Sequence, residues 1–213
     1  PAARSLATRK FLQLPVSLQH IFDMNYPSLK ALALVLLGAS QHVWGQTTQT
    51  PCRQSLSPGF DFEVDATETF TIRWSIDLAQ ETVSFQAVSE SVSWVGIGFS
   101  SDGNMVVQDS VIGLPDEATV LEYLMEQRNI NFVLPFEDAE ITQGIVSQGA
   151  TSTTLSFTRP LAPEAEGKLA LSAETGDSNT LIYAFGQSNV LANHGPTQRG
   201  SITLDLTCGF TLT

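Results

Sequence analysis

Apolar and polar residues alternate along most of the chain after residue 50. The segments 69–76 and 82–88 place an apolar side chain at every second position, which is typical of strands with one buried face. The segment 93–100 is richer in apolar residues, and its Gly96 and Gly98 allow a close backbone approach or a bulge. Further segments predict strands in the same way: 106–107, 110–113, 131–134, 141–146, 153–158, 168–171, 181–185 and 200–206.

These segments amount to about ten short strands in one all-β domain over residues 50–210. Turn-forming Gly, Pro, Asp and Ser separate them at the spacing expected of a sandwich or barrel. The segment 116–127, which is short and acidic, is the one candidate helix.

Residues 1–45 differ from the rest of the chain. Lys30 precedes an unbroken apolar run over 31–39, and short residues follow at 43–45. A positive segment, a short apolar run and small residues together predict a secretory signal peptide over 24–45, since a membrane span takes about 20 apolar residues. Residues 1–23 then form an untranslated leader or an extended n-region. We expect a protein that is secreted or lies on the extracellular face of the membrane.

Composition excludes two classes of protein. Hydrophobic residues make up 42% of the chain, which is enough for a folded core and argues against wholesale disorder. The formal charge of −12 argues against nucleic-acid binding, which needs a basic face. Without residues 1–45 the chain keeps six Lys and Arg against 21 Asp and Glu. This acidic surface could steer cations or positively charged proteins toward it.

Two cysteines, Cys52 and Cys208, lie near the two ends of the predicted domain. In an oxidising compartment an even pair favours a disulfide. Two free or intermolecular thiols are the alternative. No CxxC or Cys/His cluster is present, which disfavours structural zinc.

Residues for catalysis are scarce. No GxSxG, HExxH, P-loop or Rossmann motif occurs, and His194 is the one histidine after the leader. Met105 follows a polar turn at 102–104, where an apolar side chain has no evident packing role. A thioether and an imidazole are the pair that hold haem iron in many electron-transfer cytochromes. Core or surface roles for each residue remain alternatives.

The order of several short motifs resembles the DOMON domain family over residues 60–206, nearly the whole predicted domain. The matching segments are 94–100, Met105, 109–113, 153–161, 181–186, His194 and 199–206. The resemblance implies an immunoglobulin-like antiparallel β-sandwich. Its haem-binding branch includes the cytochrome domain of cellobiose dehydrogenase and modules joined to cytochrome b561.

In that branch, the resemblance implies a haem b whose axial ligands fall on Met105 and His194. Candidate walls of the haem pocket are the aromatic residues Trp94, Phe99, Tyr183 and Phe185, each with a sandwich-core role as its alternative. Arg159 and Arg199 are candidates to pair with haem propionates, with surface or structural ion pairs as the default. No CxxCH is present, so the haem would be held without covalent attachment.

The resemblance favours an electron-transfer module rather than a catalyst. Its redox partner would be a flavoprotein, a membrane cytochrome b561 or an external acceptor, and whether a membrane domain follows Thr213 is left open. The alternative is a haem-free DOMON module that binds a carbohydrate or protein ligand. A third hypothesis, a blue-copper site at His194 with a methionine, needs Cys52 or Cys208 as a thiolate ligand.

Overall fold

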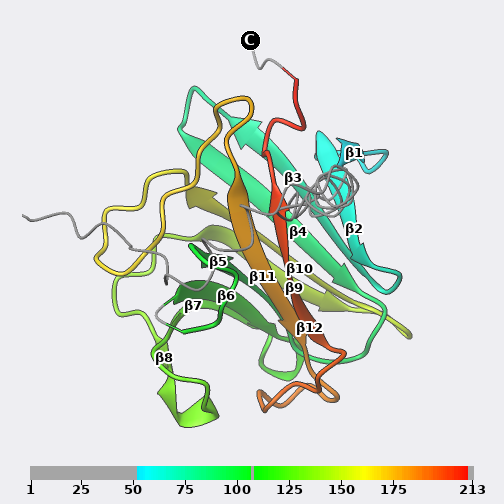
Figure 1. The fold of residues 1–213 in the computed structure, drawn as a ribbon. Helices are drawn as coiled ribbons and strands as arrows, with labels where there is room; N and C mark the ends of the chain where they lie inside the picture. The colour runs from blue at the N-terminus through cyan, green and yellow to red at the C-terminus, as the bar shows by residue number, and fades with distance from the viewer. Residues whose placement is uncertain (1–51, 107, 211–213) are drawn as a thin grey trace, which may run out of the picture. The chain divides into compact units, whose positions relative to one another are not determined.

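The fold is described by a computed structural model for residues 52–106 and 108–210. The predicted signal peptide at 24–45 and the segment 1–23 lie outside the described residues. Within the described residues, twelve strands form two antiparallel sheets of six strands each, which pack face to face as a sandwich (Figure 1). This confirms the predicted all-β sandwich, with slightly more strands than the ten expected.

The first sheet has the order β1-β2-β3-β4-β10-β9. Its strands are β1 (Arg53–Gln54), β2 (Phe62–Thr67), β3 (Phe70–Asp77), β4 (Thr82–Ser89), β9 (Thr142–Gln148) and β10 (Thr153–Pro160). The second sheet has the order β12-β11-β5-β6-β7-β8. Its strands are β5 (Val95–Ser100), β6 (Gln108–Leu114), β7 (Thr119–Met125), β8 (Val133–Pro135), β11 (Asn179–Phe185) and β12 (Arg199–Leu204).

The core between the sheets follows the alternation seen in the sequence. In β3 every second residue from Phe70 to Trp74 is buried, and β4 contributes Val83, Phe85 and Ala87 in the same way. The indole of Trp74 donates a 2.7 Å hydrogen bond from Nε1 to the carbonyl of Leu206, which satisfies its polar atom inside the core.

The predicted helix over 116–127 is wrong. Only a single 3₁₀ turn, η2 (Pro115–Glu117), forms there, and β7 follows and pairs with β6 along its length. The acidic character of the segment is misleading because Glu122 points inward and forms a 2.8 Å ion pair with the buried Lys168. A second short turn, η3 (Ile130–Phe132), precedes β8.

The segment 168–171, predicted as a strand, instead runs beside β10 without joining a sheet. Its backbone makes individual hydrogen bonds in place of a strand ladder. The Leu171 N–H donates to the Leu161 carbonyl, and the Leu169 carbonyl accepts a hydrogen bond from the Arg159 side chain. The segment covers the buried guanidinium of Arg159 and supplies Lys168, which pairs with Glu122, and its local sequence reveals neither role.

Cys52 and Cys208 form a disulfide across a sequence separation of 156 residues, as predicted. The bond ties the start of the described domain to the segment after β12. Because both thiols are consumed, neither can serve as the thiolate that the blue-copper hypothesis requires, so that hypothesis is wrong. No helix in the described ranges has the length and apolar character needed to span a membrane.

Candidate functional site

A pocket of about 320 Å³ lies on the second sheet, on the face turned away from the sandwich core. In β5, Val95, Ile97 and Phe99 enter the core, so Gly96 and Gly98 alternate onto the opposite face and line the pocket. The absence of a side chain on Gly98 lets Ile182 of β11 lie directly over it, since a Cβ on Gly98 would lie 2.7 Å from Cγ1 of Ile182. The pocket is at the small end of the range for ligand sites.

Met105 belongs to the loop that follows β5, and it lines the pocket. Ser100 organises this loop: its Oγ accepts the Gly103 N–H at 2.9 Å and donates to the Asn104 carbonyl at 2.9 Å. Asp102 accepts the Asn104 N–H at 2.8 Å. The turn residues of the sequence thus build a hydrogen-bonded loop that holds the backbone just before Met105.

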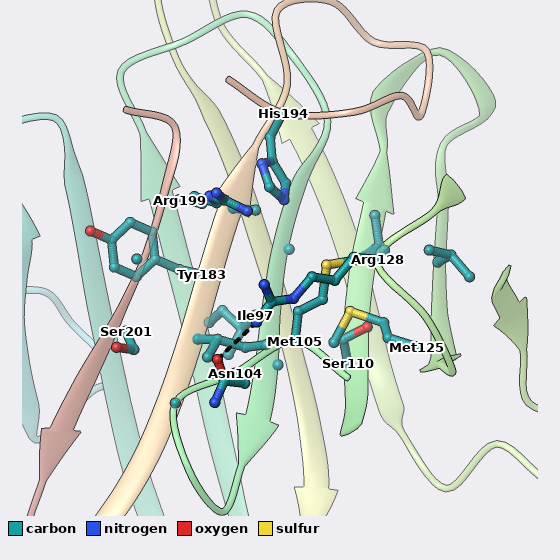
Figure 2. Close-up of a pocket in the computed structure, with 18 of the residues that line it drawn as sticks. Ile97, Asn104, Met105, Ser110, Met125, Arg128, Tyr183, His194, Arg199 and Ser201 are labelled. Atoms are coloured by element: carbon teal, nitrogen blue, oxygen red, sulfur yellow. Dashed lines mark hydrogen bonds between the residues drawn. The ribbon is translucent and has the colours of Figure 1, made fainter. Parts of the chain in front are cut away.

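His194 lies in the loop between β11 and β12 and lines the same pocket. Gln198 closes this loop, since its Oε1 accepts the Gly195 N–H at 2.8 Å and its Nε2 donates to the Gly186 carbonyl at 2.8 Å. In Figure 2 the imidazole of His194 and the side chain of Met105 extend toward each other from opposite ends of the pocket.

The imidazole of His194 has a free nitrogen. Its Nδ1 is buried and has no hydrogen-bond partner among the described residues. Burial, together with the positive charge of Arg199, lowers the pKa of His194, which favours the neutral ring. A neutral imidazole with an unpaired buried nitrogen is the state in which histidine ligates a metal.

Met125 also lines the pocket, and the sequence analysis did not single it out. It ends β7, is buried, and brings a second thioether to the pocket beside Ser110 (Figure 2). Its place at the end of a strand in a segment expected to be helical hid this position. The register of β7 reveals this position, because it pairs Met125 with Gln108, which follows the loop that carries Met105.

The four aromatic candidates divide between the pocket and the core. Trp94 lines the pocket, with its indole centroid 6.4 Å from that of His194. Phe99 and Phe185 do not line it, because their positions in β5 and β11 face the sandwich core. Tyr183 contributes to the lining, but its ring stacks on Phe70 in the core at 4.7 Å between centroids.

The two arginine candidates also separate. Arg159 is 1% exposed, forms a 3.1 Å ion pair with Asp109, and holds its guanidinium 3.8 Å from the ring centroid of Phe99. This buried structural pair keeps Arg159 out of the pocket, in agreement with the default expectation. Burial outweighs the attraction of Arg159 and raises the pKa of Asp109. Arg199 lines the pocket, and so does Arg128, which the sequence analysis did not consider.

The chain is similar to several known proteins. MOXD1 homolog 2 of Drosophila melanogaster is 28% identical over 151 residues, which cover 68% of this chain and 19% of that protein. DBH-like monooxygenase protein 2 of Mus musculus is 28% identical over 142 residues, which cover 62% of this chain and 20% of that protein. This chain therefore spans about a fifth of the length of these curated relatives.

A solved structure shares the fold. The cytochrome domain of Myriococcum thermophilum cellobiose dehydrogenase superposes with a TM-score of 0.54 and 18% identity, over 75% of this chain and 90% of that chain. A profile of the DOMON domain matches residues 66–186, which is more than half of the sequence. The order of the strands, the two-sheet architecture and this match agree, and the chain is a member of the DOMON domain family.

Proposed function

We propose that this protein is an extracellular b-type cytochrome domain that carries single electrons through a haem b ligated by Met105 and His194. One observation carries the proposal: two loops far apart in the sequence bring a thioether and an imidazole into the lining of one pocket. This pair of axial ligands is found in electron-transfer cytochromes.

The pocket residues fit this group in two respects. The unpaired buried Nδ1 of His194 leaves the imidazole without a competing hydrogen bond at that atom. Gly96 and Gly98 of β5 let the side chains of Ile112 and Ile182 lie close over the sheet, and Trp94 and Leu191 add apolar walls. The chain contains no CxxCH motif, so the haem would be held by ligation and packing.

The donor set also indicates the kind of chemistry. A haem supplies a reversible one-electron couple, and a methionine ligand raises its reduction potential. Met105 and His194 would both hold the iron, and the chemistry that the group would then supply is electron transfer rather than reaction with a bound substrate. We therefore propose an electron carrier that serves a flavoprotein, a membrane cytochrome b561 or an external acceptor. The disulfide between Cys52 and Cys208 supports an extracellular location, because disulfides persist in oxidising compartments.

The test compares variants of the secreted chain after reconstitution with haem. The wild type is expected to give the sharp low-spin bands of a six-coordinate haem when reduced. Met105→Leu and His194→Ala should each lose these bands. Met125→Leu is the matched control, because it removes a pocket thioether that is not proposed as a ligand and should leave the bands unchanged.

Two outcomes would contradict the proposal. A folded protein that stays colourless with excess haem would favour the alternative of a haem-free DOMON module. Low-spin bands that persist in both Met105→Leu and His194→Ala would show that other residues ligate the iron.

A further inference from the structure

The pocket differs in charge from the rest of the protein. The chain has 22 Asp and Glu against 10 Lys and Arg. Among the described residues that line the pocket, two are arginines, Arg128 and Arg199, and none is Asp or Glu. On so acidic a chain, a pocket with positive residues alone is unexpected unless it serves an anion.

The other cations of the described domain are already paired. Arg53 and Arg73 contact Glu63, Arg159 contacts Asp109, and Lys168 contacts Glu122. By contrast, no carboxylate of the described residues lies within ion-pair distance of Arg128 or Arg199. Arg128 donates a 3.1 Å hydrogen bond to Oδ1 of Asn104, a neutral acceptor. The two guanidiniums left without a counter-charge are therefore the two that line the pocket.

Trp94, which lines the pocket, also carries an unpaired donor. Trp94 is 4% exposed, and its Nε1–H has no acceptor among the described residues. Buried donors are almost always paired in folded proteins, so an unpaired one calls for an explanation. The one side-chain amide oxygen in the lining, Oδ1 of Asn104, already accepts a hydrogen bond from Arg128. The Trp94 donor lies against Gly186, which does not line the pocket, so the inference depends on the two guanidiniums. The lining gives them no charged acceptor, which suits an anionic ligand.

We propose that Arg128 and Arg199 bind the two carboxylates of the pocket's ligand, which in haem are the propionates; this rests on the proposed function. Guanidinium presents paired N–H donors that match a carboxylate, and such charge-assisted hydrogen bonds are stronger than neutral ones. Arg128 precedes β8 and Arg199 begins β12, so the two carboxylates would be bound by arginines from two separate segments of the second sheet. In Figure 2 both side chains extend into the pocket, Arg199 beside His194 and Arg128 beside Asn104.

Arg128 has a second consequence for the site. Its hydrogen bond to Asn104 joins the segment after β7 to the loop that carries Met105. A carboxylate bound by Arg128 would therefore lie next to the residue that precedes the proposed methionine ligand. Carboxylate binding and iron ligation would then order the same loop.

The test measures the affinity of the secreted chain for three porphyrins by quenching of tryptophan fluorescence. Haem carries the iron and the carboxylates, protoporphyrin IX lacks the iron, and haem dimethyl ester lacks the free carboxylates. Arg128→Gln and Arg199→Gln should each weaken the binding of haem and of protoporphyrin IX by about tenfold or more, because each variant loses hydrogen bonds between charged groups. Neither should change the affinity for the ester. Arg53→Gln, an exposed arginine of the other sheet, is the matched control and should change nothing.

The two proposals fail in different ways. The carboxylate assignment is wrong if the arginine variants bind haem as tightly as the wild type. It is also wrong if their affinity for the dimethyl ester falls as much as their affinity for haem. If haem gives no low-spin spectrum while protoporphyrin IX still binds in an arginine-dependent way, the carboxylate assignment stands and the iron ligation fails. If no porphyrin binds, both are overturned. Because both arginines are exposed, the variants should unfold at the same urea concentration as the wild type.

Discussion

The floor of the pocket gives a prediction that depends on the position of one methyl group. A Cβ on Gly98 would lie 2.7 Å from Cγ1 and 2.9 Å from Cδ1 of Ile182, whereas a Cβ on Gly96 would lie 3.2 Å from Cγ1 of Ile112. The first distances are too short for carbon atoms and the last is only tight. We therefore expect Gly98→Ala to push the Ile182 side chain into the pocket and Gly96→Ala to be accommodated.

The magnitudes follow from two opposing contributions. Replacing glycine by alanine in a strand stabilises by about 0.5–1 kcal/mol through backbone entropy. Overpacking costs about 1–3 kcal/mol where side chains must move. For Gly98→Ala the overpacking dominates, and we expect a net loss of about 1–2 kcal/mol in unfolding free energy. For Gly96→Ala the two contributions nearly cancel, within about 0.5 kcal/mol by the same principles.

Urea unfolding of both variants measures these differences, and haem titration measures the effect on the pocket. Gly98→Ala should weaken haem binding by about tenfold, the equivalent of about 1.4 kcal/mol. Adding Ile182→Ala should restore part of both losses, which a double-mutant cycle reports as a coupling of about 1 kcal/mol. Equal unfolding free energies and equal haem affinities for the two glycine variants would refute the packing of Ile182 over Gly98.

Three further predictions concern stability, each measured by urea unfolding. Lys168→Met leaves Glu122 buried without its 2.8 Å partner and should lower the unfolding free energy by about 3–5 kcal/mol. The double variant Lys168→Met with Glu122→Leu should regain most of this loss. Equal losses in the single and double variants would contradict this reasoning. Replacing Cys52 and Cys208 by serine should cost about 5 kcal/mol, from the 156-residue separation, and an unchanged midpoint would argue against the bond. Although burial opposes it, hydrogen bonds from Gly176 and Thr207 lower the pKa of Asp205. The loss of unfolding free energy in Asp205→Asn should therefore have its full size above about pH 5 and become smaller as the pH falls below about 4. A loss that becomes larger in acid would refute the lowered pKa of Asp205.

The sequence predicted those parts of the fold that depend on neighbouring residues. Alternation along β3 and β4 identified the core positions from Phe70 to Ala87, because a strand with one buried face leaves a period of two. It could not predict β7, since the inward position of Glu122 is stabilised by Lys168, 46 residues away. Contacts at that distance leave no local pattern.

The sequence predicted two residues that line the pocket, and it predicted the pocket walls less well. Met105 and His194 came from a family resemblance, and the pocket brings them into one lining. Phe99 and Phe185 were chosen as aromatic residues in the right strands, but a strand directs successive side chains to opposite faces, and theirs is the core. Arg128 lies in a loop without a motif, and only the fold reveals its position.

The most direct test of the central claim asks whether Met105 ligates haem when the protein is loaded with haem and reduced. A methionine methyl group held over a haem lies in the ring current, so its proton NMR resonance moves far upfield of the other methyl signals. We predict one such resonance, present in the wild type and in Met125→Leu and absent in Met105→Leu. The absence of any shifted methionine resonance, or its loss in Met125→Leu instead, would contradict ligation by Met105.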